Sequence, residues 1–228
     1  MRNLHFLIVP ALLLVMVSSA RAQYSVKVEP DTILAGEEQA KITVSTDKTN
    51  LNLNCVARKG GGNFSDFKLV ATGSGQVNQA TFETPFPGEV QIEVLDGKFN
   101  KIGVGDVTVV APIVEIMEQE SLDRFDGRSK SMPLMVRVVD HRGQFVKTAK
   151  LTCKISEIVN KKTVASSAKV TDFVLRDTYY EAAITGLKDA SYKVEVTDVN
   201  HVEAFDKADN PDNAHPSAVI EGLNITIE

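Results

Sequence analysis

The chain contains few of the residues that build catalytic and metal sites. Of its 228 residues none is tryptophan, two are cysteine and four are histidine. No His-x-x-x-His, Glu-plus-two-His or Cys-x-x-Cys spacing occurs, so the patterns typical of zinc sites are missing. The sequence also has no Gly-x-Ser-x-Gly turn and no glycine-rich phosphate loop between a strand and a helix. We therefore expect a protein that is not an enzyme.

Clustered positive charge is also lacking. The chain carries 25 lysines and arginines against 30 aspartates and glutamates. The one basic cluster, Lys161-Lys162, is too small to neutralise a run of phosphates. Nucleic acids and anionic membranes are therefore not expected as partners.

Only one long apolar run occurs, over residues 4–17. It follows the charged start Met1–Asn3 and precedes Ser18–Ala22, which ends in an Ala-x-Ala cleavage motif, so residues 1–22 have the three parts of a secretory signal peptide. The run is shorter than the roughly 20 residues that a membrane-spanning helix needs. No cysteine stands directly after it to carry a lipid, since the first is Cys55. We expect a mature chain that starts at Gln23, is secreted or periplasmic, and has no membrane span.

The rest of the sequence alternates apolar and polar residues in short runs, a pattern typical of half-buried strands. Glycine- and proline-rich turns separate the runs. About seven strands are expected before Pro112, near residues 24–29, 39–46, 51–58, 67–72, 76–84, 88–96 and 104–111. About seven more follow, near 113–116, 133–140, 150–158, 169–176, 178–185, 190–198 and 217–227. Only Glu118–Arg128 could hold a helical turn. The predicted fold is all-β, with two tandem immunoglobulin-like β-sandwich domains at 23–112 and 113–228.

Each predicted domain has one cysteine on its third strand, Cys55 and Cys153. The antibody-type pattern needs two cysteines and a tryptophan in one domain, so it is excluded. Equivalent positions in tandem domains are too far apart for the 4.4–6.8 Å Cα spacing of a disulfide. We expect buried free thiols that act as small apolar residues. An interdomain disulfide is the alternative.

Two segments of the second domain resemble bacterial immunoglobulin-like domains of the invasin and intimin type. One is the strand, turn and strand of Val136–Val146 and Ala149–Cys153, with Asp140 and Gly143 at the turn. The other, Tyr180–Val196, is similar to the later hairpin of that family and of macroglobulin-like sandwiches. The resemblance implies a sandwich fold and an extracellular setting. Such domains serve as adhesin repeats, spacers and binding modules, and they share no catalytic residues.

The loop at 205–213 is rich in oxygen-bearing side chains. Asp206, Asp209 and Asp212 are candidate calcium ligands, because calcium takes six to eight oxygens from carboxylates, amides and carbonyls. The spacing does not match an EF-hand loop. Asp, Asn and Pro are also ordinary turn formers, so a solvated loop is the alternative. No other cofactor is expected.

Two loops are candidate binding surfaces because binding residues concentrate in loops at the ends of a sandwich. The first, residues 59–66, offers Asn63, Phe64 and Asp66, and the second, residues 200–217, offers His201, Asn210 and His215. The predicted function is an exported, non-enzymatic binding or structural module that recognises a protein partner or cell-surface component, as in adhesion. The alternatives are a carbohydrate-binding module, which would use an exposed ring such as that of Tyr179 or Tyr180, and an accessory protein of an extracytoplasmic hydrolase.

Overall fold

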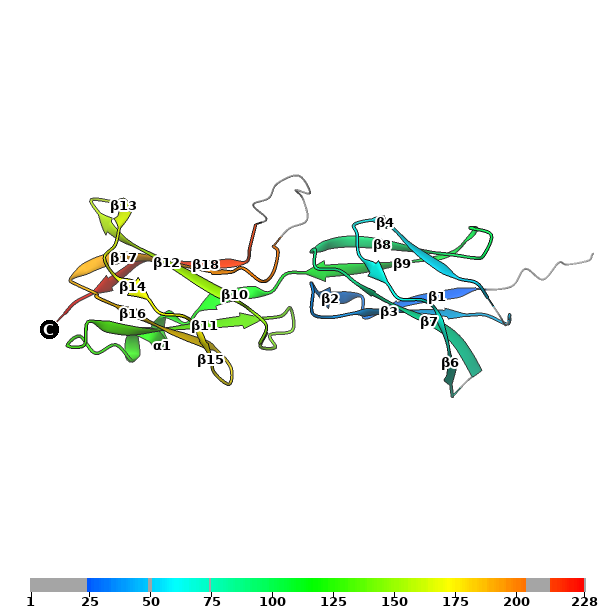
Figure 1. Ribbon diagram of the computed structural model, residues 1–228, viewed down its shortest axis with the longest axis horizontal. Coiled ribbons are helices and arrows are strands. Elements are labelled where there is room, and N and C mark those ends of the chain that lie inside the picture. Colours follow the sequence, from blue (N-terminus) through cyan, green and yellow to red (C-terminus); the bar gives the residue numbers. More distant parts are fainter. Residues whose placement is uncertain (1–23, 49–50, 74, 204–213, 228) are drawn as a thin grey trace, which may run out of the picture.

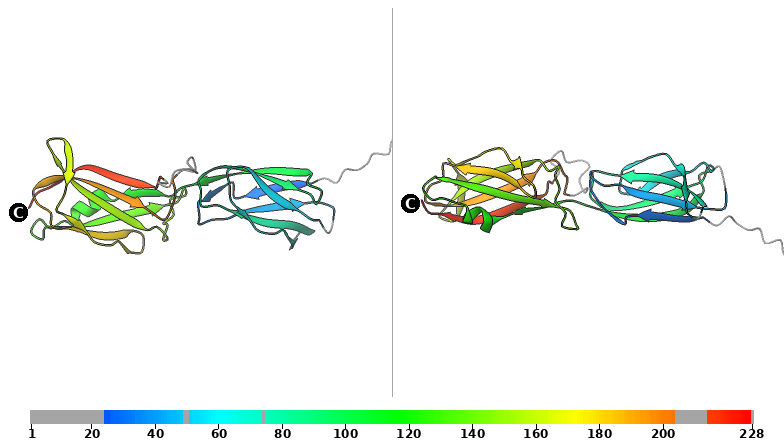
Figure 2. Two further views of the ribbon diagram at one scale, coloured as in Figure 1. Left: turned by 45° about the horizontal axis from the view of Figure 1, so that its top comes forward. Right: turned by 90° about the horizontal axis from the view of Figure 1, so that it is seen from below.

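The computed structural model describes residues 24–48, 51–73, 75–203 and 214–227. Strands make up most of these residues, and their one helix is α1 (Glu118–Asp123), so the all-β prediction is confirmed. No helix in this part of the chain is long and apolar enough to cross a membrane. Two sandwich domains lie end to end in every view (Figures 1 and 2). The predicted signal peptide lies outside the described residues.

The first domain is built from two sheets that pack face to face. One sheet has the order β1 (Ser25–Glu29), β3 (Ala40–Ser45), β7 (Gly75–Glu83), with the short β5 (Asn63–Phe64) and β6 (Lys68–Thr72) both pairing with β7. The other has the order β2 (Thr32–Leu34), β9 (Lys101–Val110), β8 (Gly88–Leu95), β4 (Asn54–Lys59). Strand β2 is parallel to β9, and every other pairing of these strands is antiparallel. The arrangement is immunoglobulin-like, with the first strand divided between the two sheets.

The second domain repeats this plan. One sheet has the order β10 (Ile113–Ile116), β11 (Ser131–Val139), β16 (Tyr180–Thr185), with β14 (Lys169–Val170) and β15 (Val174–Leu175) along the far side of β16. The other has the order β13 (Lys162–Ala165), β12 (Leu151–Val159), β17 (Ala190–Asp198), β18 (Ser217–Ile225). Within the described residues, strands before Ala111-Pro112 pair only with one another, as do the strands after it.

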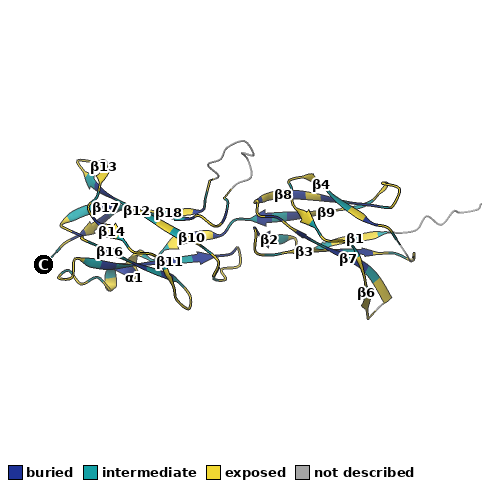
Figure 3. Cartoon of the chain, viewed as in Figure 1, coloured by how far each residue is buried: buried dark blue, intermediate teal, exposed yellow. Residues whose placement is uncertain are grey.

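Alternation along the strands produces the core of each domain. In β3 and in residues 90–94 of β8, every second residue is buried and the residues between are more exposed (Figure 3). Ile42, Val44, Ile92 and Val94 are fully buried between the sheets of the first domain. Because apolar side chains fill the space between the sheets, no disulfide is needed to join them.

Both cysteines are free, as predicted, and the alternative interdomain disulfide is not formed. They are half-buried rather than fully buried, and each packs against the core cluster of its own domain. Burial raises the pKa of Cys55 to about 12 and, with a smaller contribution from Glu195, that of Cys153 to about 12. Both side chains are thus thiols at neutral pH and unsuited to act as nucleophiles.

Two buried tyrosines of the second domain form hydrogen bonds between their hydroxyl groups and the backbone. Tyr192 is fully buried near the start of β17, where its hydroxyl accepts a hydrogen bond from Lys188 N–H (3.0 Å) and lies 3.3 Å from the Lys188 carbonyl oxygen. This is the tyrosine corner of immunoglobulin-like folds. Tyr180 is buried and donates to the Val146 carbonyl (3.0 Å). Its neighbour Tyr179, in the bend just before β16, is half-exposed.

Candidate functional site at the domain junction

The two domains are joined by a very short link. Strand β9 ends at Val110 and β10 begins at Ile113, which leaves only Ala111-Pro112 between them. Leu34, at the end of β2, is 4% exposed and packs with the core cluster of the second domain. Next to it, Ala35 N–H donates to the Val110 carbonyl (2.9 Å). Apolar packing therefore crosses the junction beside the covalent link.

His201 makes a polar contact across the same junction. Its side chain is 3% exposed, and its Nδ1 lies 2.6 Å from Asp198 Oδ2 in the second domain. Its Nε2 lies 3.3 Å from Oε1 of Glu37, in the turn before β3 of the first domain. Asp198 is fully buried, and its Oδ1 accepts the backbone N–H groups of Lys150 and Asn200, both at 3.0 Å. The imidazole thus bridges carboxylates from two domains.

The surroundings of His201 favour its charged form. Burial opposes the positive charge, but the hydrogen bond and charge of Asp198, followed by those of Glu37, outweigh it and raise the pKa of His201 above its usual value of 6.5. As imidazolium, both ring nitrogens donate hydrogen bonds. When the ring loses a proton, the shorter contact with Asp198 keeps Nδ1–H, and Glu37 then faces a nitrogen lone pair.

This arrangement predicts a pH-dependent junction. A histidine whose pKa is raised on folding contributes stability that is complete below about pH 6.5 and disappears as pH rises through the raised value. We expect Glu37→Ala to lower the free energy of unfolding by about 1 kcal/mol at pH 6 and by much less at pH 9, measured by thermal unfolding. Glu89→Ala, at an exposed glutamate of β8, is the control. An equal loss at both pH values would contradict the prediction.

A second ion pair crosses the junction. The Arg142 guanidinium contacts Oε1 of Glu38 in the first domain, and it lies 3.0 Å from Asp140 Oδ2 in the second. Oε2 of Glu38 accepts Leu34 N–H (2.8 Å). Burial alone would raise the pKa of Asp140, but hydrogen bonds from Gln144 and Arg142 outweigh it and lower the pKa. The Glu38 carboxylate therefore bonds to the backbone of its own domain and to Arg142 of the next.

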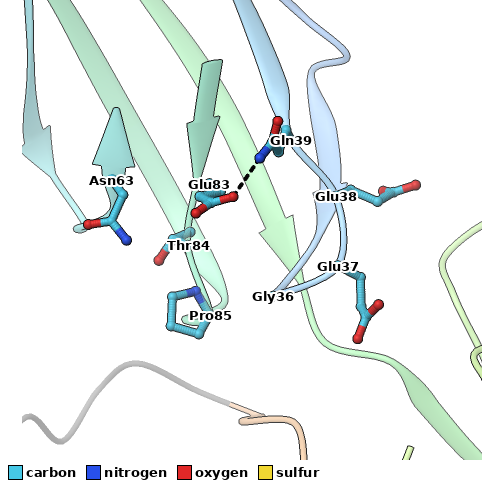
Figure 4. A pocket seen from close by; sticks show the side chains of 8 residues that line it. All are labelled: Gly36, Glu37, Glu38, Gln39, Asn63, Glu83, Thr84 and Pro85. Carbon is cyan, nitrogen blue, oxygen red and sulfur yellow. Dashed lines mark hydrogen bonds between the residues drawn. The ribbon is translucent and has the colours of Figure 1, made fainter. Parts of the chain in front are cut away.

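A hollow of about 340 Å³ lies beside these contacts (Figure 4). It is lined by Gly36, Glu37, Glu38, Gln39, Asn63, Glu83, Thr84 and Pro85. Gln39 Nε2 donates to Glu83 Oε2 (2.6 Å) on one side of the hollow. Three carboxylates and no aromatic ring line it. The hollow therefore suits polar or cationic groups better than a sugar ring, which needs a flat aromatic face.

The structure separates the three residues predicted in the first loop. Asn63 and Phe64 form strand β5 rather than part of a loop, and their role in binding stays a prediction. Phe64 is half-buried, with its ring centroid 5.1 Å from that of Phe82, because the strand turns it towards the core. Asn63 is exposed and lines the hollow, whereas Asp66 is exposed in the connection that follows.

The second loop is described only at its ends. His201 is buried at the junction instead of exposed for binding, because Asp198 and Glu37 hold its ring. His215 is half-buried, and its Nδ1 lies 2.6 Å from the His201 carbonyl oxygen. Asp206, Asp209, Asn210 and Asp212 lie outside the described residues, so the calcium site stays a prediction. In the described part of the chain, no three His, Cys, Asp or Glu side chains are placed to hold a metal ion.

Sequence reasoning missed four residues of the junction: Glu37, Glu38, Arg142 and Asp198. The first two belong to a turn, Ala-Gly-Glu-Glu, Arg142 belongs to the turn after β11, and Asp198 ends a strand, so each has an ordinary local explanation. Glu37 and His201 are 164 positions apart. No local spacing relates residues so distant, and only the end-to-end placement of the domains brings them together.

Comparisons with known proteins found likeness to solved structures alone. No protein-family model matches the chain, and no curated protein matches it. It is similar to the adhesin FdeC of Escherichia coli (14% identity, 89% of this chain and 64% of that one, TM-score 0.34). It is also similar to the adhesin InvE of Yersinia pseudotuberculosis (12%, 88% and 58%, TM-score 0.36) and to titin domains A168–A170 (8%, 89% and 65%, TM-score 0.37).

This chain spans less than two thirds of the length of each of these structures. The resemblance to bacterial immunoglobulin-like domains of the invasin type stays a resemblance, because FdeC and InvE share only 14% and 12% identity with this chain, at TM-scores of 0.34 and 0.36. At these identities and TM-scores, the likeness identifies no residue of the junction and no ligand.

Proposed function

We propose that the chain is an exported, non-enzymatic binding module whose two sandwiches form one stiff unit that presents loops and strand edges to a protein partner outside the cytoplasm. The observation that carries the proposal is the junction. A two-residue link allows few orientations, and the contacts of Glu37 with His201 and of Glu38 with Arg142 favour one of them. A stiff unit lowers the entropy lost when a partner binds.

The second domain offers an edge suited to a protein surface. Val174 and Leu175 form β15, which lies at the edge of its sheet beside β16, and their side chains are 50% and 46% exposed. Beside them lies a hollow of about 570 Å³ lined by Lys147, Leu175, Arg176, Asp177 and Tyr179. An edge strand has backbone groups that can pair with a partner strand. Apolar residues mixed with an arginine and a tyrosine are typical of protein interfaces.

A carbohydrate-binding module is the second candidate, because the half-exposed ring of Tyr179 lines the hollow beside β15. One ring gives a sugar a single stacking face. The other four residues around this hollow are Lys147, Leu175, Arg176 and Asp177, so its lining is mixed in charge and has no second flat face. Protein binding is therefore favoured.

Binding to intact cells tests the proposal and separates the two candidates. Fluorescently labelled residues 23–228 are titrated onto bacterial and animal cells, with and without prior protease or periodate treatment. We expect saturable binding that protease removes and periodate leaves unchanged. Loss of binding after periodate alone would favour the carbohydrate-binding module. No saturable binding to any cell would contradict the proposed function.

A further inference from the structure

The hairpin between β8 and β9 lies at the end of the first domain that is away from the second (Figure 1). Phe99, in this hairpin, is 75% exposed, more than any other large apolar side chain among the described residues. An isolated exposed apolar residue needs no explanation by itself. The backbone conformation of Phe99 and the hydrogen bonds of the turn around it indicate that this exposed ring has a role.

Phe99 adopts an unfavourable backbone conformation. Its φ is +62°, in the left-handed region that glycine or asparagine normally occupies at this place in a short hairpin. Phe99 N–H donates to the Asp96 carbonyl, and Asp96 N–H to the Asn100 carbonyl, both at 2.9 Å. A bulky residue at this position costs stability, and its exposed ring offsets little of that cost by burial.

Asp96 holds the hairpin in shape. Its Oδ1 accepts the backbone N–H groups of Lys98 (2.8 Å) and Asn100 (2.9 Å), and Oδ2 accepts from the Asn100 amide (3.0 Å). Hydrogen bonds from the Asn100 side chain and then its backbone lower the pKa of Asp96. The exposed ring is therefore presented by an ordered turn, which reduces the entropy lost on contact.

Lysines surround the hairpin. Lys98 and Lys101 are exposed on either side of Phe99, and Lys101 Nζ lies 3.4 Å from Glu93. The positions of Gly103 and Gly105 against Val26 and Val28 show that β1 starts at this same end of the domain. There Lys48 Nζ lies 5.8 Å from the centre of the Tyr24 ring. Acidic groups balance these lysines, since Glu93 pairs with Lys101, Asp96 lies within the hairpin and Asp47 directly precedes Lys48.

We infer that Phe99 is the anchor of a protein-binding tip, and that it enters an apolar pocket on the partner. This inference rests on the proposed function and gives the partner its chemistry. Buried aromatic side chains carry a large share of the energy at protein interfaces. A membrane is the weaker occupant, because even a myristoyl chain alone binds bilayers marginally, and one ring buries less apolar surface.

The melting temperatures of variants distinguish a role of Phe99 in binding from a role in stabilising the fold. We expect Phe99→Gly to raise the melting temperature by roughly 3 °C, since glycine adopts a positive φ without strain. Lys98→Gly, at the neighbouring residue of the same turn, is the control and lowers it. A fall of several degrees for Phe99→Gly would show that the ring supports the fold, which would overturn the inference.

Binding to protease-sensitive sites on cells tests the anchor itself. We expect Phe99→Gly to weaken binding about thirtyfold and Phe99→Leu to weaken it much less, while Leu69→Ala, at another exposed apolar residue of the first domain, changes little. Equal binding of Phe99→Gly and the unmodified chain would overturn the inference and leave the proposed function intact. Phe99-dependent binding to phosphatidylserine vesicles, or Phe99-dependent self-association in sedimentation, would replace the inferred partner. No saturable binding of the unmodified chain would contradict the proposed function.

Discussion

Replacing Asp198 by alanine is expected to lower the free energy of unfolding of the second domain by about 4 kcal/mol. The carboxylate is fully buried and accepts from Lys150 N–H, Asn200 N–H and the His201 ring. Its removal leaves the buried His201 ring and two partly buried backbone N–H groups without an acceptor, and an unpaired buried donor or charge costs far more than the net value of its hydrogen bond. The same change removes the strongest influence that favours the charged form of His201.

Tyrosine fluorescence during urea unfolding measures this loss. The chain has no tryptophan, and Tyr179, Tyr180 and Tyr192, three of its four tyrosines, lie in the second domain. Asp189→Ala is the matched control, because this exposed aspartate accepts one backbone N–H, that of Ile227 (2.6 Å). We expect the control to cost about 1 kcal/mol or less. A loss for Asp198→Ala no larger than that of the control would show that the buried network adds little stability.

Gly103→Ala is expected to destabilise the first domain by about 3 kcal/mol, because β1 packs directly on the glycines of β9. A Cβ at Gly103 would lie 2.2 Å from Val26 Cγ2 and 2.7 Å from Val26 Cβ. Gly105 meets Val28 Cγ2 at the same 2.2 Å. Valine is stiff at χ1, so its side chain cannot simply turn aside, and β1 must move away from β9.

Scanning calorimetry on the chain shows whether the first domain alone is affected. Gly61→Ala serves as the control, because a Cβ there has no atom within 4 Å and its φ is not in the left-handed region. We expect Gly61→Ala to leave both unfolding transitions nearly unchanged and Gly103→Ala to lower one of them. If Gly103→Ala melts like the control, the close packing of β1 on β9 is not needed for stability.

The sequence predicts the strands well where alternation alone decides them. The predicted strand at 39–46 corresponds to β3 and the one at 190–198 to β17, because one face of each is buried and the other is not. The helical turn expected within Glu118–Arg128 corresponds to α1. Strand β2, three residues that pair in parallel with β9, was not predicted, since so short a run has no readable period.

The site is harder to predict because it depends on contacts between distant residues. His201 was predicted for its place in a loop, yet its neighbours in space, Asp198 and Glu37, bury it. Nothing in the sequence from Lys101 to Val110 indicates that the Val26 side chain packs directly on Gly103. Phe99 follows a glycine and a lysine in an ordinary turn sequence, and its positive φ and exposure are visible only in the structure.

The most direct test of a stiff two-domain unit is ¹⁵N relaxation of residues 23–228 at pH 6, where His201 is charged. We predict that the backbone amides of both domains fit one elongated diffusion tensor. With Glu37→Ala and Arg142→Ala combined, we expect the data to require a separate tensor for each domain. If the unmodified chain already requires two independent tensors, each with the short correlation time of a single sandwich, the contacts at the junction do not fix the domains and the account is wrong.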